Sequence, residues 1–180
     1  MTDIDDLTAR NQAFVQHSFD PALSINPAGN MMVIGCVDPR VDPTRVLGIK
    51  HGEAAVIRNV GGRITPQTLR TLVMLAKVGV ANQVEPRTGD WNLVILHHTD
   101  CGMTDLAAFP ALLAEYFEVP ADQLAGKSVS DPIGSVRVDT DVIIHTMSGT
   151  RFLVSGLVYD VATGLVQTVV PPTLLKTPTA

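Results

Sequence analysis

Two short, mainly apolar runs constrain the fold of this chain more than any other feature of its sequence. The first covers residues 31–37 and reads Met-Met-Val-Ile-Gly-Cys-Val, and the second covers residues 91–97 and reads Trp-Asn-Leu-Val-Ile-Leu-His. Runs of this length are typical of strands buried on both faces, because a strand with one wet face alternates apolar and polar residues. Both are far shorter than the roughly 18 apolar residues of a membrane helix. The sequence therefore predicts central strands of a parallel sheet.

Other segments of the chain predict alternating strands and helices around these two runs. Further strands are expected at 54–58 and 151–159, and 165–170 is expected to pair back as a hairpin. Helices are expected at 5–19, 65–79, 106–117 and 130–147. The last range is ambiguous, because its start is typical of a helix while many later residues are β-branched. The pattern predicts one α/β domain over 1–180, with a mainly parallel central sheet flanked by helices and a C-terminal antiparallel hairpin.

Composition and charge exclude several classes of protein. Apolar residues make up 46% of the 180 residues and charged residues 17%, which is typical of a globular domain and not of a disordered one. The net charge is −5 and no basic run occurs, so neither nucleic acid nor a membrane is expected as a partner. The acidic start, residues 1–6, is unlike a signal peptide. Two cysteines are too few for a disulfide scaffold, and we expect a reducing, cytoplasmic location.

The two cysteines and one histidine are candidate zinc ligands. Cys36 ends the first apolar run, and His98 and Cys101 follow the second. Because the carboxyl ends of parallel strands share one edge of a sheet, we expect these side chains to be neighbours. Two thiolates and an imidazole suit Zn²⁺. The chain has no CxxC pair to complete a structural site, so the fourth position falls to water or to a movable carboxylate. The alternatives are a Cys36–Cys101 disulfide, which a reducing compartment disfavours, or two inert buried thiols.

A carboxylate and a guanidinium stand next to the first of these ligands. Asp38 follows Cys36 by two residues, and Arg40 projects to the same side of an extended segment. An arginine fork can hold a carboxylate in one orientation, so Arg40 is expected to orient Asp38 beside the metal. Two thiolates nearly cancel the charge of zinc, and its water should be less acidic than on a three-histidine site, where the pKa is about 7. Asp38 would help by accepting a hydrogen bond from that water, unless the two residues form only a surface ion pair.

Three runs of the sequence, taken together, resemble the β-class carbonic anhydrases. They are Cys36–Arg40, Gly52–Gly62 and His98–Gly102, in order between about residues 31 and 103. The likeness is closest to the short branch of the family, which also includes carbonyl sulfide hydrolase-like members. The resemblance implies zinc bound by Cys36, His98 and Cys101, with Asp38 and Arg40 as the catalytic pair. It also implies that Asp38 can close onto zinc as a fourth ligand and switch the enzyme off.

The resemblance carries further expectations about assembly and the substrate pocket. It implies a homodimer or homotetramer in which the N-terminal helix, about residues 4–19, packs on a partner subunit. The residues assigned to the substrate pocket are Ala55, Asn59, Gly61 and Gly102. The chain departs from the family at three positions, of which Val60, where alanine is usual, is minor. Ala55 stands where members usually have histidine or an aromatic residue, and Pro39 where they usually have serine or alanine.

These residues support one leading reaction and two alternatives. The leading hypothesis is zinc-dependent hydration of carbon dioxide to bicarbonate by a metal-bound hydroxide, the reaction of a carbonate dehydratase lyase. The first alternative is hydrolysis of carbonyl sulfide to hydrogen sulfide and carbon dioxide on the same zinc site, which the small Ala54–Ala55 pair favours. The second is a catalytically silent zinc protein with Asp38 closed on the metal. A nucleotide site is disfavoured, because neither G-x-G-x-x-G nor a P-loop follows the first apolar run.

Overall fold

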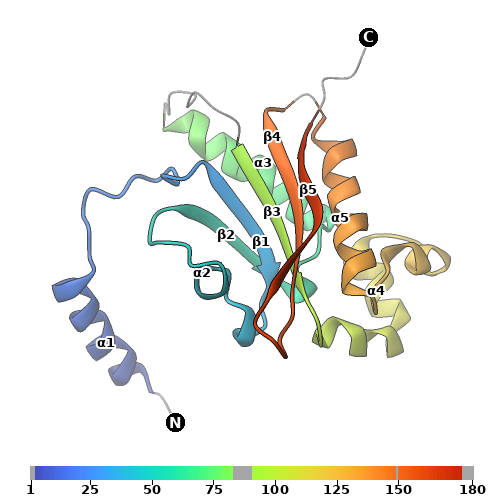
Figure 1. The fold of residues 1–180 in the computed structure, drawn as a ribbon, viewed down its shortest axis with the longest axis horizontal. Helices are drawn as coiled ribbons and strands as arrows, with labels where there is room; N and C mark the ends of the chain where they lie inside the picture. The colour runs from blue at the N-terminus through green and yellow to red at the C-terminus, as the bar shows by residue number, and fades with distance from the viewer. Residues whose placement is uncertain (1–2, 83–90, 149, 176–180) are drawn as a thin grey trace.

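The computed structural model describes residues 3–82, 91–148 and 150–175, and it contains a five-stranded sheet in the order β2-β1-β3-β4-β5 (Figure 1). The strands are β1 (Met31–Cys36), β2 (Ala54–Asn59), β3 (Trp91–His98), β4 (Phe152–Tyr159) and β5 (Val166–Leu174). The first four are mutually parallel, and β5 runs antiparallel to β4. The predicted fold class is therefore confirmed.

The helices begin where the sequence offers side-chain caps and prolines. They are α1 (Ile4–His17), α2 (Pro43–Val46), α3 (Pro66–Ala81), α4 (Pro110–Phe117) and α5 (Pro132–Thr146). The N-cap side chains of Thr65 and Asp131 accept backbone N–H groups in the first turns of α3 and α5, and each helix then starts with proline. This chemistry explains why the ambiguous range 130–147 is a helix. Its β-branched residues Val136, Thr140 and Ile143 recur at helical spacing and are all buried.

The hydrophobic core lies between the sheet and the helices α3 and α5. Leu72 of α3 and Val136 and Ile143 of α5 belong to one buried cluster with alternate residues of the central strands. Those strand residues are Met32, Ile34, Leu93, Ile95, Val154 and Val158. Because this cluster fixes the sheet against two helices, the loops at the carboxyl ends of β1 and β3 have a rigid support.

Several predicted element boundaries were wrong, and one of them is the end of α1, which lies at His17 and not at residue 19. The helix expected at 106–117 is two elements, a 3₁₀-helix at Gly102–Ala108 and then α4, because Pro110 disfavours helical backbone at Phe109 (φ −123°, ψ 64°). Helix α3 does not end at Gly79 but continues to Ala81. Strand β5 extends beyond residue 170 to Leu174, and it accommodates two prolines because it is an edge strand.

Helix α1 stands apart from the sheet and is joined to it by a long extended segment (Figure 1). The helix buries none of its residues in this chain. Apolar side chains on it, among them Ile4, Leu7 and Val15, are at least half exposed. Within the described residues, no helix combines the length and the apolar character that crossing a membrane would need.

Candidate metal centre and active site

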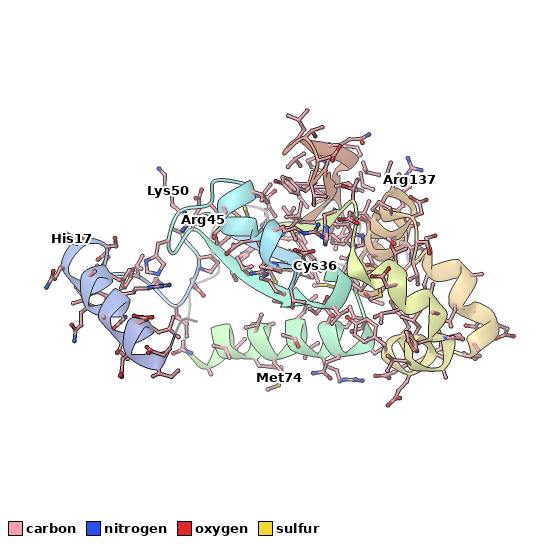
Figure 2. All side chains as sticks on the ribbon, turned by 90° about the horizontal axis from the view of Figure 1, so that it is seen from below. His17, Cys36, Arg45, Lys50, Met74 and Arg137 are labelled. Atoms are coloured by element: carbon pink, nitrogen blue, oxygen red, sulfur yellow. The ribbon has the colours of Figure 1, made fainter. Side chains whose placement is uncertain are left out.

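The parallel register brings the ends of β1 and β3 to one edge of the sheet. Strand β1 pairs with β2 on one side and with β3 on the other, so Cys36 stands beside Asn59. His98 is the last residue of β3, and Cys101 caps the 3₁₀-helix that follows. Figure 2 shows Cys36 in the body of the molecule, far from His17 on α1. The topology thus explains how residues distant in sequence reach one place.

Cys36, His98 and Cys101 form a compact cluster that could hold a metal ion. Their ligand atoms all lie within 4.8 Å of one another, and Cys36 and His98 are buried. The two Sγ atoms are 3.9 Å apart. Two sulfurs at about 2.3 Å from a tetrahedral zinc would be about 3.8 Å apart. A disulfide needs about 2.05 Å, and both cysteines are free thiols. The spacing fits zinc and does not fit a crosslink.

The imidazole of His98 is oriented as a metal ligand would be. Its Nδ1 lies 2.8 Å from the carbonyl oxygen of Thr99, which can only accept, so Nδ1 carries the proton and donates. Its Nε2 is buried and has no hydrogen-bond partner among the described residues. A buried polar atom without a partner is rare in proteins, and metal-bound histidines characteristically donate their other nitrogen to a carbonyl or carboxylate. The donor set therefore fits a zinc ion.

The protonation of the two sulfurs is strongly coupled. The contact between the two Sγ atoms lowers the pKa of Cys36 to about 4 against the effect of burial. The same contact, together with burial, raises the pKa of Cys101. Of the two thiols, Cys36 is therefore the one that ionises first, and Cys101 keeps its proton to higher pH. Binding of a divalent cation would release the remaining thiol proton, because thiolates are the ligands.

Asp38 and Arg40 form the predicted pair, and Arg40 also reaches the loop between the two later ligands. The guanidinium contacts both carboxylate oxygens of Asp38, with Nη2 2.7 Å from Oδ2 and Nε 3.1 Å from Oδ1. It also donates to the side chain and carbonyl of Asp100, at 2.7 and 2.8 Å. The hydrogen bonds from Arg40 lower the pKa of Asp38 to about 2. The carboxylate is thus ionised at neutral pH and turned towards Arg40, and it does not belong to the metal cluster.

Arg58 is a residue of this site to which the sequence reasoning gave no role. Its Nε donates to the carbonyl of Cys36 at 2.9 Å, and its Nη2 donates to the carbonyl of Asp38 at 2.7 Å. These bonds fix the backbone that leads from the first ligand to the carboxylate. The sequence feature that could have pointed to Arg58 is its position, since it lies one residue before the end of β2, beside Gly35 of β1.

The four residues assigned to the substrate pocket differ in where they lie. Gly61 lines a cavity beside the cluster and has a φ of 75°, and a Cβ there would meet Met103 at 2.9 Å. The amide of Asn59 instead closes its own turn, since it accepts the backbone N–H of Arg63 and donates to its carbonyl, both at 2.8 Å. Gly102 is exposed and opens the 3₁₀-helix after Cys101.

Ala55 is not brought to the metal cluster in this chain. It stands beside Met32 near the amino end of β2 and lines a separate apolar cavity of about 390 Å³ with Trp91 and Phe152. The reason is the direction of the strand, because only its carboxyl end, at Asn59, reaches the edge of the sheet where Cys36 lies. The small Ala54–Ala55 pair therefore does not widen the cavity beside Cys101.

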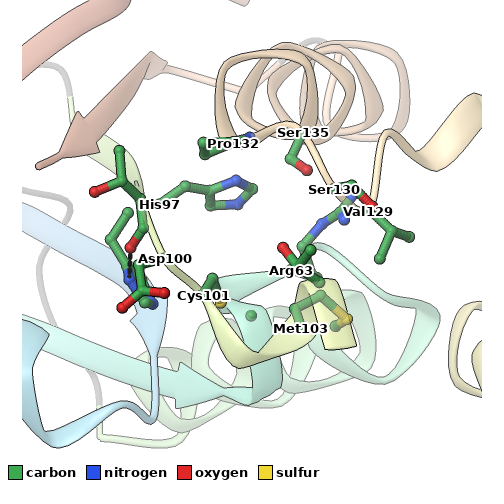
Figure 3. Close-up of a pocket in the computed structure, with 13 residues that line it drawn as sticks. Arg63, His97, Asp100, Cys101, Met103, Val129, Ser130, Pro132 and Ser135 are labelled. Carbon is green, nitrogen blue, oxygen red and sulfur yellow. Dashed lines mark hydrogen bonds between the residues drawn. The ribbon is translucent and has the colours of Figure 1, made fainter. Parts of the chain in front are cut away.

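The cavity beside the cluster has a volume of about 230 Å³ and a buried polar wall. His97 and His98 both line it. The ring of His97 extends into this space (Figure 3), and its Nε2 lies 3.2 Å from a carboxylate oxygen of Asp139. Arg63 completes the group, with Nε 2.7 Å from the same carboxylate. These three residues are at most 3% exposed.

The fold and the site together define a class of protein. It is an α/β protein with two thiols, an imidazole and an oriented carboxylate at the carboxyl edge of its parallel sheet, a set of groups typical of zinc enzymes. Comparison with known proteins identifies the family. A family model described as carbonic anhydrase matches residues 31–118. The chain is 33% identical over 175 residues to β-carbonic anhydrase 1 of Mycobacterium tuberculosis, covering 95% of this chain and 100% of that protein. The chain therefore belongs to the β-carbonic anhydrases, a family of lyases.

Two further comparisons bear on the fold and on the range of relatives. The crystal structure of a carbonic anhydrase from Streptococcus mutans superposes with a TM-score of 0.69 at 30% identity, covering 94% of this chain and 98% of that one. A carbon disulfide hydrolase of Acidithiobacillus thiooxidans is 33% identical over 75 residues, which is 41% of this chain and 33% of that enzyme. The predicted family is thereby confirmed, and it has relatives with a different named substrate.

Proposed function

We propose that this protein catalyses the hydration of carbon dioxide to bicarbonate, with zinc bound by Cys36, His98 and Cys101. The observation that carries this proposal is the cluster of these three side chains, in which Cys36 and His98 are buried and Nε2 of His98 has no hydrogen-bond partner in the described part of the chain. The similarity to a β-carbonic anhydrase along nearly the whole chain supports the same reaction. Zinc bound here would lower the pKa of a water molecule and so supply a nucleophile at neutral pH.

The protein's own groups prepare the site for that chemistry. The carboxylate of Asp38, whose pKa is lowered to about 2, accepts hydrogen bonds and stays ionised throughout the neutral range. Arg40 fixes its orientation through both oxygens, and Asp100 anchors the far side of the same guanidinium. Arg58 holds the backbone carbonyls on either side of Val37. We infer that Asp38 orients the attacking water and that Arg40 keeps the carboxylate away from the metal position.

Hydrolysis of carbonyl sulfide or carbon disulfide is the second candidate. The similarity to a carbon disulfide hydrolase favours it, although that similarity covers only 41% of the chain. Both substrates are linear like carbon dioxide but longer and more apolar. A catalytically silent zinc protein is the third reading and requires Asp38 to be a fourth ligand. The arrangement of Asp38 against Arg40 supports an open fourth position instead.

One comparison of rates tests all three readings. A single preparation, with its zinc content measured, is assayed for carbon dioxide hydration by stopped flow and for sulfide release from carbonyl sulfide and carbon disulfide. Fast hydration with slow sulfide release is the expected result. Efficient sulfide release with poor hydration would replace the proposal with the second candidate. A fully zinc-loaded protein that is inactive on all three substrates, even at alkaline pH, would support the silent protein.

We further propose that α1 packs on a second copy of this chain. A 14-residue helix that buries no side chain is marginal in water, because helices this short need tertiary packing. Its apolar residues have a counterpart on the outer side of α3, where Val73 and Met74 are 61% and 68% exposed and Met74 points away from the sheet (Figure 2). The joint burial of these two surfaces would stabilise a dimer or a larger assembly.

Molar mass in solution tests this assembly. The wild type is expected to be a dimer or larger by size exclusion with light scattering. Leu7 and Val15 of α1 are 50% and 54% exposed. Replacing both by glutamate is expected to give monomers. The matched control replaces Gln12 and Gln16 by glutamate, since both are exposed polar residues of the same helix. A monomeric wild type, or the same change in mass for both double variants, would contradict the packing of α1 on a second copy.

A further inference from the structure

Two consecutive glycines after β2 pack on the segments that carry the metal ligands. A Cβ on Gly62 would stand 3.0 Å from the backbone nitrogen of Cys36. A Cβ on Gly61 would stand 2.9 Å from the side chain of Met103, two residues after Cys101. Because no space separates this glycine turn from the backbone that carries these ligands, a displacement of the turn would be passed on to both sulfurs.

The conformation of the glycine turn is fixed by side chains outside it. Gly61 and Gly62 have positive φ angles of 75° and 67°, and glycine loses more conformational freedom on folding than any other residue. Tyr116 of α4 donates to the carbonyl of Val60 at 2.8 Å. Nε2 of His97 lies 3.2 Å from the carbonyl oxygen of Gly62, which can only accept, so this nitrogen carries the proton. The turn therefore depends on its neighbours for a single geometry.

The buried carboxylate of Asp139 joins the glycine turn, β3 and α5. It accepts from the guanidinium of Arg63 at 2.7 Å and from the backbone N–H of Ile64 at 3.1 Å, directly after the glycines. It also lies 3.2 Å from Nε2 of His97, the residue next to His98 in β3. Asp139 is 1% exposed, and hydrogen bonds in such a medium of low dielectric are strong. One carboxylate on α5 thus contacts both the chain after the turn and the strand that ends in a metal ligand.

We propose that Asp139 is a positioning residue of the metal centre, whose carboxylate sets the geometry in which Cys36, His98 and Cys101 meet a metal ion. It acts through the glycine turn and through the residue before His98, and it is not part of the ligand cluster itself. The proposal rests on the metal ligands that the proposed function assigns, but not on carbon dioxide as the substrate. A purely structural ion pair would stabilise the fold but leave the metal affinity of the folded protein unchanged.

Zinc affinity and the spectrum of bound cobalt test this role in the folded, full-length protein. The wild type and each variant are stripped of metal, and circular dichroism establishes a temperature at which all are folded. Zinc affinity is measured by competition with a chelator, and Co²⁺ is added separately to record its d–d bands and the thiolate-to-metal charge-transfer bands. Asp139→Asn is expected to bind zinc about 10- to 100-fold more weakly, as is typical when a group that orients metal ligands is lost, and to shift the d–d bands.

Two further variants separate positioning from a loss of stability. Ile143→Ala opens a cavity one turn further along α5, which costs stability without touching the carboxylate, and wild-type zinc affinity is expected. The double variant Arg63→Met with Asp139→Leu replaces the buried ion pair by apolar side chains and so recovers stability. It is nevertheless expected to bind zinc as weakly as Asp139→Asn, and it carries the test if Asp139→Asn does not fold without metal.

The outcomes distinguish the positioning role from the ligand set. The proposal is overturned if Asp139→Asn keeps the affinity and d–d bands of the wild type, if Ile143→Ala binds zinc as weakly as Asp139→Asn, or if the double variant regains wild-type affinity. A wild type without thiolate charge-transfer bands would remove the ligand set of the proposed function, and the positioning role with it.

Discussion

Replacing Asp139 by asparagine is expected to destabilise the protein strongly, because it breaks a fully buried ion pair. The carboxylate accepts from Arg63 at 2.7 and 3.3 Å, from the backbone N–H of Ile64 at 3.1 Å and from His97 at 3.2 Å. Both charged side chains are 1% exposed. Removing one partner of such a pair leaves the other charge uncompensated and costs about 3–5 kcal/mol of the free energy of unfolding. In a chain of this size that corresponds to a fall in Tm of roughly 6–20 °C.

The pH dependence of stability provides a second signature of the same residue. Burial raises the pKa of Asp139, but the hydrogen bonds from His97 and the charge of Arg63 outweigh it, and the net pKa is lowered. A carboxyl whose pKa is lower in the folded state stabilises the fold above its unfolded pKa of about 3.9. That contribution to stability is lost as the pH falls through the pKa of Asp139 in the folded state. The difference in stability between wild type and Asp139→Asn is therefore expected to be constant above about pH 5 and to shrink below pH 4.

Urea unfolding of the zinc-loaded protein at fixed protein concentration measures both effects. The control is the double variant Arg63→Met with Asp139→Leu, which removes both charges and is expected to be more stable than Asp139→Asn, since apolar pairs often replace buried ion pairs at little cost. A loss below about 1 kcal/mol in Asp139→Asn would refute the reasoning, because it lies in the range of exposed pairs. A double variant that is less stable than Asp139→Asn would also refute the reasoning.

Three further predictions concern the site and its supporting turn. Arg40→Ala is expected to lower the rate of carbon dioxide hydration by about 100-fold, because Asp38 loses its orientation, while the zinc content stays unchanged. Stopped-flow rates and metal analysis test this prediction, and a wild-type rate would contradict it. His98→Ala is expected to bring the zinc content after dialysis near zero, so full retention would exclude it as a ligand. Gly61→Ala is expected to destabilise by about 1–3 kcal/mol, since φ is 75° and the added Cβ meets two side chains. Gly79→Ala, with open space around it, is expected to stabilise by about 0.5–1 kcal/mol, and thermal unfolding of the pair distinguishes strain from a general effect of alanine.

Sequence reasoning could predict the sheet and the metal cluster because both follow from local patterns. Apolar runs define β1 and β3, and parallel pairing then forces their carboxyl ends to one edge. The cluster needs no further information, since Cys36 and His98 are the last residues of those strands. The place of Ala55 in a substrate pocket stays a prediction from the resemblance, because the direction of β2 keeps this residue away from the cluster within one chain.

The buried pair of Arg63 and Asp139 could not be predicted in the same way. The two residues are 76 positions apart, and neither belongs to a periodic pattern that marks its partner. Each would ordinarily be expected at the surface, because charged residues are almost never fully buried unless paired. The only available hint was the place of Asp139 in a helix whose neighbours Val136, Thr140 and Ile143 form the buried face. Tertiary packing, not local sequence, determines which cation it meets.

The position of Arg40 shows why two runs that look independent in sequence act as one unit. One run supplies Cys36 and Asp38, and the other supplies His98 and Cys101 on either side of Asp100. Arg40 binds Asp38 through one edge of its guanidinium and Asp100 through the other. A shift of the loop that carries the later ligands would therefore move Arg40 and release the carboxylate. It follows that Asp100→Asn should impair the orientation of Asp38 without removing any metal ligand, which links the geometry of the metal cluster to the carboxylate beside it.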